Sequence, residues 1–111
     1  MWGKSTSKTR VRLFFLMITF KEHFNKRGNV LAACDSNLIN KSFIEKDKEV
    51  IISDKFYGNK KATKQEFIKL LSKHDNINLV GNKVVEIAIK EGKVKKYSLI
   101  QGVKLAIILT I

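Results

Sequence analysis

The last third of the chain opens with Asn78-Leu79-Val80-Gly81-Asn82-Lys83-Val84-Val85-Glu86-Ile87-Ala88-Ile89, the stretch that constrains the architecture most. Its first residues are an Asn/Gly-rich break, and the remainder predicts a helix from about Asn82 to Glu91. Glu86 and Lys90 have the favourable order for an i,i+4 ion pair, and Gly92 suits the left-handed position beyond the helix end. The apolar stripe is broad, so we expect this helix to pack between a sheet and a neighbour.

A second helix is predicted from about Lys64 to Lys73, after a strand-to-helix connection that contains Phe56-Tyr57-Gly58. Thr63 can cap this helix while Glu66 reaches back to the cap, an arrangement known as a capping box. The side chains expected to face the core share one side at helical spacing: Phe67, Leu70, Leu71 and His74. Both predicted helices are therefore packing helices.

Five segments have the pattern of β-strands. They are Met17–His23, Val30–Cys34, Glu49–Ser53, Tyr97–Ile100 and Lys104–Leu109. The turn at residues 26–29 makes the first two a β-hairpin, and Gln101-Gly102-Val103 separates the last two. This order of strands, two helices and strands predicts an α+β fold, in which a small, mostly antiparallel sheet carries two helices on one face.

The chain is strongly basic. Its 111 residues, enough for one domain, include 22 Lys or Arg against 10 Asp or Glu, a net charge of +12. Only Arg10, Arg12 and Arg27 are arginine, so the excess is almost wholly lysine. A charge of this size fits a nucleic-acid or anionic-membrane partner, but an AT-rich genome or growth at high temperature also enriches lysine.

The first 16 residues differ from the rest. They carry four basic and no acidic residues, and the apolar run Leu13–Ile18 is too short to span a bilayer and lacks a small-residue cleavage site. We expect residues 17–111 to form the domain, with residues 1–16 a basic tail or a stretch translated upstream of a native start at Met17. Without those four charges the balance is 18 basic to 10 acidic residues, still +8. Cys34 is the single cysteine, so we expect a cytoplasmic protein without an internal disulfide.

The sequence predicts no enzyme. Besides carboxylates, the candidate metal ligands are His23, His74 and Cys34, and pairing of the first hairpin would place only His23 near Cys34. A cysteine nucleophile needs a base, and Asp35 would point to the opposite face of a strand. The segment Gly58–Thr63 has one glycine and its lysines do not match a P-loop. We therefore expect no catalytic residue, metal or cofactor.

Four short stretches carry a family resemblance: Val30-Leu31-Ala32-Ala33-Cys34-Asp35, Asn40-Lys41-Ser42-Phe43, Phe56-Tyr57-Gly58 and Asn78-Leu79-Val80-Gly81. From about Met17 onward, the chain resembles the small archaeal proteins grouped as domain of unknown function 424 (DUF424). The motif positions are Cys34, Asp35, Phe43, Phe56, Tyr57, Gly58, Asn78, Leu79, Val80 and Gly81. The chain departs from the family pattern at Asn40, where the family has glycine, and at Gly102-Val103-Lys104, where it has a Gly-x-Pro turn. The resemblance implies an archaeal source, no established activity and a loose association with translation genes.

Binding of nucleic acid, RNA in particular, is the leading functional hypothesis. Lysines beside a helix N-terminus attract phosphates, and aromatic side chains stack on unpaired bases. The candidate contacts are Tyr57, Gly58, Lys60, Lys61 and Lys64 in one patch, and Lys93, Lys95 and Lys96 in another. The structural alternative is that Thr63 and Glu66 occupy the helix amides, that the lysines are merely solvated and that Phe56 anchors the loop in the core.

The alternative function is a protein adaptor without nucleic-acid contact. It would dock on a ribosome-associated or initiation-linked partner by extending that partner's sheet, through Lys104–Leu109 or the edge of the first hairpin. The apolar residues 105–109 form either a central strand or an exposed edge, and a central position would weaken this hypothesis. A membrane-surface role through Leu13–Phe20 ranks third, and we expect no membrane partner.

Overall fold

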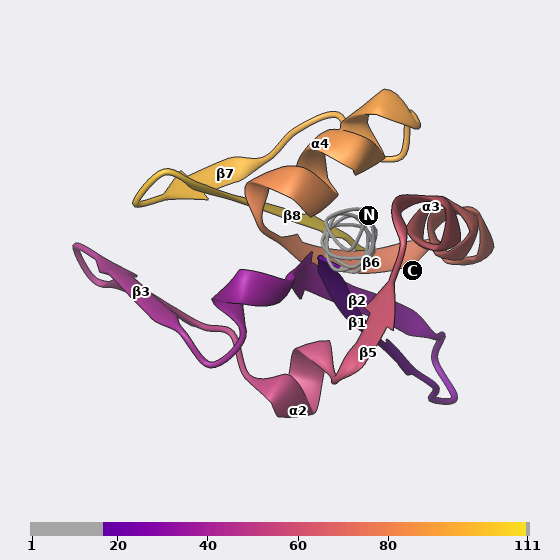
Figure 1. Cartoon of the computed structure of the whole chain (residues 1–111), viewed down its shortest axis with the longest axis horizontal. Coiled ribbons are helices and arrows are strands. Elements are labelled where there is room, and N and C mark those ends of the chain that lie inside the picture. Colours follow the sequence, from indigo (N-terminus) through magenta and orange to yellow (C-terminus); the bar gives the residue numbers. More distant parts are fainter. Residues whose placement is uncertain (1–16, 111) are drawn as a thin grey trace, which may run out of the picture.

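The computed structural model describes residues 17–110, so the predicted extension over residues 1–16 lies outside the described part. Six strands form one mixed sheet in the order β5-β1-β2-β6-β8-β7, and β3 pairs with β4 in a separate hairpin (Figure 1). The sheet strands are β1 (Ile18–His23), β2 (Val30–Asp35), β5 (Lys60–Ala62), β6 (Asn76–Val80), β7 (Ser98–Ile100) and β8 (Val103–Ile108). The hairpin strands are β3 (Ser42–Glu45) and β4 (Lys48–Ile51). The helices are α2 (Asp54–Tyr57), α3 (Lys64–Lys73) and α4 (Asn82–Lys90), and a 3-10 turn, η1 (Ser36–Leu38), follows β2.

The predicted fold class is confirmed. Every neighbouring pair in the six-stranded sheet is antiparallel except β2 and β6, which run parallel at its centre. The predicted hairpin of β1 and β2 forms, with Thr19 opposite Cys34 and His23 opposite Val30. The predicted hairpin of β7 and β8 also forms, so the sheet is mostly antiparallel as expected.

The main departure is β6, which occupies the segment interpreted as a break before the second helix. Its residues Ile77, Leu79 and Val80 are buried, while Asn76 and Asn78 are partly buried. Asparagine is uncommon in strands, so the two asparagines obscured the apolar run in the sequence. A strand therefore separates the two predicted helices, and its pairing with β2 provides the parallel step of the sheet.

Alternate residues of the central strands face two apolar layers. Leu31 and Ala33 of β2 join the layer formed by α3 and α4, in which Phe67 and Val84 are fully buried. Ala32 and Cys34 face the other layer, where Tyr57 of α2 packs. The two long helices thus cover one face, as predicted, and the short helix α2 lies against the opposite face.

Both predicted helices form with the expected capping. In α3 the Glu66 side chain accepts a hydrogen bond from the Thr63 backbone at 2.8 Å, and the Thr63 hydroxyl accepts one from the Glu66 backbone at 3.1 Å. Gly92 follows α4 with φ 75°, the left-handed conformation predicted. The expected pair of Glu86 with Lys90 is replaced, because Glu86 binds Lys104 of β8 at 3.1 Å.

The elements missed by sequence analysis are short. Helix α2 begins at Asp54, where only a break was expected, and β5 follows it with three residues. The third predicted strand is shifted to Lys48–Ile51 and pairs with the unpredicted β3. In this hairpin Phe43 packs against the core, while Ile44 and Ile51 are 57% and 63% exposed. Tertiary contacts, and not local propensity, stabilise elements of this length.

The two departures from the family pattern both fall in turns. Asn40 has φ 66°, a left-handed conformation that asparagine tolerates better than other residues with side chains, so it can stand where the family has glycine. Gly102 has φ 79° in the turn between β7 and β8, next to Gln101 at φ 50°. The consecutive positive φ angles match a two-residue hairpin turn, which forms here without proline.

Candidate functional site

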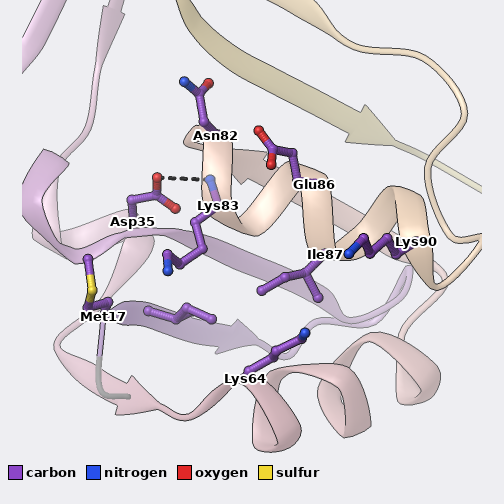
Figure 2. A pocket seen from close by; sticks show the side chains of 9 residues that line it. Met17, Asp35, Lys64, Asn82, Lys83, Glu86, Ile87 and Lys90 are labelled. Carbon is purple, nitrogen blue, oxygen red and sulfur yellow. Dashed lines mark hydrogen bonds between the residues drawn. The ribbon is translucent and has the colours of Figure 1, made fainter. Parts of the chain in front are cut away.

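A crevice of about 510 Å³ lies where α4 begins, beside the carboxyl end of β2 (Figure 2). We refer to it as the lysine crevice. Its lining residues are Met17, Ile18, Asp35, Lys64, Asn82, Lys83, Glu86, Ile87 and Lys90. Lys64 comes from the start of α3, and Lys83 and Lys90 lie seven residues apart on α4. In open sheets with parallel strands, ligands commonly bind outside the carboxyl ends of those strands, and the crevice occupies that position.

One wall of the lysine crevice is formed by Asp35 and the N-terminus of α4. Residue Gly81 precedes the helix and has no side chain to cap it, so the cap comes from the neighbouring strand. The Asp35 carboxylate accepts hydrogen bonds from the backbone N–H groups of Lys83, at 3.1 Å, and Val84, at 3.0 Å. Gly81 has φ 131°, and a Cβ atom there would lie 2.4 Å from Asp35 Cγ. The close approach of Asp35 to α4 therefore requires glycine at residue 81.

The acidic groups of the crevice already have partners in the fold. Burial raises the pKa of the Asp35 carboxyl, while its two backbone hydrogen bonds and the Lys83 ammonium oppose that shift. Glu86 is paired with Lys104. Within residues 17–110, Lys64 and Lys90 form no ion pair. The crevice is thus positively charged on the side of Lys64 and Lys90, and Figure 2 shows both lysines directed toward Ile87.

The Phe56-Tyr57-Gly58 motif fixes α2 to the sheet. The Tyr57 hydroxyl donates a hydrogen bond to Asn78 Oδ1 at 2.7 Å, and Tyr57 is 5% exposed. Burial raises the pKa of Tyr57, and the Cys34 thiol adds to the shift. A Cβ atom at Gly58, which has φ 82°, would lie 2.4 Å from the backbone oxygen of Phe20. Tyr57 and Gly58 are therefore buried structural residues and leave the set of candidate RNA contacts.

Phe56 has a different environment from Tyr57. Its ring stacks on the His23 imidazole with centroids 4.8 Å apart, and His23 Nε2 lies 2.7 Å from the Phe56 backbone oxygen. Phe56 is 37% exposed, so it neither fills the core nor stands free. The contact with His23 closes α2 against β1.

The candidate metal ligands do not converge. Cys34 of β2 lies opposite Thr19 of β1, and His23 of β1 lies opposite Val30 of β2. The thiol and the imidazole are therefore at opposite ends of the hairpin. His74 Nε2 lies 2.6 Å from Glu22 Oε2, in a separate, mostly buried pair. Residues 17–110 contain no cluster of three or more His, Cys, Asp and Glu side chains able to hold a metal ion.

Cys34 will be unreactive while the protein is folded. Burial, reinforced by Asp35 and opposed by Lys61, raises the pKa of this fully buried thiol to about 12. We expect iodoacetamide to alkylate it at least about 100-fold more slowly at pH 8.5 in buffer than in denaturing urea. The folded state binds this proton more tightly than the unfolded state does. The free energy of unfolding therefore falls as the pH rises from the ordinary cysteine pKa to about 12, and this thiol has no effect on it at lower pH. Equal alkylation rates in the two conditions, measured by mass spectrometry, would contradict the burial of Cys34.

The predicted lysine patches are only partly assembled. Lys60 and Lys61 are successive residues of β5, so they point to opposite faces of the sheet. Lys61 Nζ donates a hydrogen bond to the Thr19 hydroxyl at 3.1 Å, whereas Lys64 lines the crevice. In the connection from α4 to β7, Lys93 is half-buried and Lys95 and Lys96 are exposed. None of these three lines the lysine crevice.

Lys83 and Lys90 line the crevice but are not among the site residues predicted from the sequence. Their seven-residue spacing places them on one side of α4, and this signal was available in the sequence. Their convergence with Lys64 was not, because it depends on how α3 and α4 pack on the sheet.

A comparison with protein-family models matches residues 22–111 to the family described as protein of unknown function (DUF424). The chain belongs to the DUF424 family. The match covers all three helices, every motif position and the sheet apart from residues 18–21 of β1. No curated protein matches the chain.

A solved structure supports the fold assigned to this DUF424 chain. It is the crystal structure of an uncharacterized conserved protein from Methanopyrus kandleri, with a TM-score of 0.69 and 19% sequence identity. The alignment covers 82% of this chain and 89% of the other. At this level of identity the likeness shows a shared fold.

The DUF424 motif positions are mainly structural in this chain. Cys34, Leu79, Val80 and Gly81 are buried, and Phe43 packs against the layer beneath α2. Among the motif positions, Asp35 lines the crevice. The motif therefore builds the sheet and the α4 cap, and the crevice lysines lie outside it.

The strands suggested for strand addition lie inside the sheet, although β7 pairs only with residues 103–105 of β8 and β5 only with residues 18–20 of β1. β8 lies between β6 and β7, and the hairpin of β1 and β2 lies between β5 and β6. The outer strands β5 and β7 have three residues each, which offers a partner few unpaired backbone groups. In the described part of the chain, each helix is too short or too polar to cross a lipid bilayer.

Proposed function

We propose that this DUF424 protein is a non-catalytic accessory protein that binds RNA through the lysine crevice. One observation carries the proposal: Lys64, Lys83 and Lys90 come from two helices and line a single crevice. Asp35 and Glu86, the acidic residues of that crevice, are already engaged by the α4 backbone and by Lys104. The local charge therefore suits a phosphate ligand.

The charge of the whole domain supports a polyanionic partner. Within residues 17–110, Glu86 pairs with Lys104, whereas the contact of Glu22 with His74 involves no lysine. Most of the lysine excess is thus available to an external anion, and lysines that replace phosphate counterions bind with little sequence choice. The loose association with translation genes implied by the family resemblance favours RNA over DNA.

Neutralising the crevice lysines should abolish most of the binding. We expect the triple variant Lys64→Gln, Lys83→Gln, Lys90→Gln to bind single-stranded RNA on the order of a hundredfold more weakly at low salt, because three positive charges that line the crevice are removed. The slope of log affinity against log salt concentration should become shallower by about 2. Fluorescence anisotropy with an internally labelled RNA, titrated at several salt concentrations, measures both quantities.

A matched control separates the crevice from general charge. The variant Lys41→Gln, Lys46→Gln, Lys48→Gln removes the same charge from exposed residues in and beside the β3–β4 hairpin, away from the crevice. It should retain affinity within about threefold of the unmodified chain. Equal losses in the two variants would show that binding follows net charge and would overturn the crevice assignment. A single-stranded DNA of the same sequence tests the preference for RNA.

A further inference from the structure

We infer that the lysine crevice receives the phosphorylated end of an RNA strand, and not the middle of its backbone. The inference rests on the proposed RNA binding and assigns the part of the RNA that enters. The terminal phosphate would lie beside Lys64 and Lys90, and the terminal base against the apolar lining.

The charge of the crevice matches a terminal phosphate. A phosphomonoester carries close to two negative charges at neutral pH, because its second ionisation lies near pH 6, whereas a phosphodiester carries one. Three lysines line this one crevice, and two of them, Lys64 and Lys90, form no ion pair within residues 17–110. The electrostatic attraction of these lysines is stronger for a dianionic phosphomonoester than for a single phosphodiester.

The position of Asp35 sets where the phosphate can lie. Its carboxylate accepts hydrogen bonds from the N–H groups of Lys83 and Val84, so these two donors are not available to a second anion. The same carboxylate repels a phosphate brought near it. The phosphate is therefore directed toward Lys64 and Lys90, on the side of the crevice where Figure 2 shows Ile87.

The size and apolar lining of the crevice suit one nucleotide. Its volume of about 510 Å³ lies within the range of small-molecule sites. Met17, Ile18 and Ile87 supply apolar surface next to the lysines. A strand end can place its base on this surface and its phosphate on the lysines, since nothing continues beyond the terminal nucleotide. A mid-strand nucleotide would have to lead the chain in and out of the same crevice.

The test compares RNAs of one sequence that differ only at their ends. The full chain is titrated with an internally labelled RNA of about 12 nucleotides in four forms: 5′-phosphorylated, 3′-phosphorylated, with hydroxyls at both ends, and circular. At least one phosphorylated form should bind about tenfold or more tightly than the hydroxyl and circular forms. The phosphorylated form that binds more tightly shows whether the 5′ or the 3′ end enters the crevice. The variant Lys64→Gln, Lys90→Gln should remove that difference.

The outcomes separate this inference from RNA binding itself. Measurable and equal affinity for all four forms would overturn the strand-end inference and leave the proposed function in place. A preference that survives Lys64→Gln, Lys90→Gln would place end recognition outside the crevice and would also overturn it. Failure of every form to bind at low salt would refute the proposed function. Unchanged thermal melting of the variant confirms that its fold is intact.

Discussion

Gly81→Ala will destabilise the protein by about 3 kcal/mol or more, among the largest effects expected of a single substitution. Two costs combine at this position. The backbone has φ 131°, which residues with a side chain rarely adopt, and the new Cβ would lie 2.4 Å from Asp35 Cγ. Relieving the contact requires Asp35 to move away from the backbone N–H groups of Lys83 and Val84, so the α4 cap is lost as well. Urea denaturation followed by circular dichroism measures the change.

Gly92→Ala is the matched control for this prediction. Gly92 also has a positive φ, 75°, but a Cβ there meets no atom within 4 Å. Its substitution should cost about 1 kcal/mol, the backbone penalty alone. The double variant Asp35→Gly, Gly81→Ala should be less unstable than the sum of its single variants, because Asp35→Gly already removes the group that the Cβ would strike. Strict additivity, or equal effects at Gly81 and Gly92, would show that the Asp35 contact is not the cause.

Phe67→Ala is expected to cost about 4 kcal/mol, enough to unfold a domain of marginal stability. Phe67 is fully buried and is the largest such side chain among the described residues. It extends from α3 into the layer between the helices and the sheet, where Leu31 and Val84 also pack. Removing the ring leaves a cavity among groups held by a sheet, which cannot collapse around it. The same denaturation experiment provides the measurement.

Two further variants on α3 calibrate the effect of Phe67→Ala. Phe67→Leu keeps most of the apolar volume and should cost about 1 to 2 kcal/mol. Gln65→Ala, at an exposed position of the same helix, should change stability by less than about 0.5 kcal/mol. A small effect of Phe67→Ala would show that α3 does not pack on the sheet through this ring.

Features set by neighbouring residues could be predicted from the sequence. The capping box of Thr63 and Glu66 lies within one helical turn, and α3 begins and ends where the sequence indicated. The glycine after α4 and the hairpin of β7 and β8 are equally local. The geometry of such features can be predicted from a few residues, because hydrogen bonds between residues close in the chain form them.

Features that depend on distant pairing could not be predicted in this way. β6 was missed because its asparagines suggest a break, and only its position between β2 and β8 shows why a strand forms there. The sequence offers Tyr57 as a candidate for base stacking, yet its hydroxyl donates a hydrogen bond to Asn78, which is distant in the chain. The lysine crevice is a further case, since Lys64 is brought to the side of α4 only by the packing of the two helices.

The parallel pairing of β2 with β6 also limits how the site can be dissected. Each hairpin joins strands that are neighbours along the chain. The pairing of β2 with β6 instead closes the long segment of residues 36–75 between them. Closing that segment has an entropic cost that only the complete domain offsets. Asp35 precedes that segment, Lys64 lies within it and Lys83 follows it. A fragment that ends before β6 contains Asp35 and Lys64 but lacks α4, and with it Lys83 and Lys90. The proposed recognition by this crevice thus requires the assembled domain, and no peptide excised from the chain is expected to reproduce it.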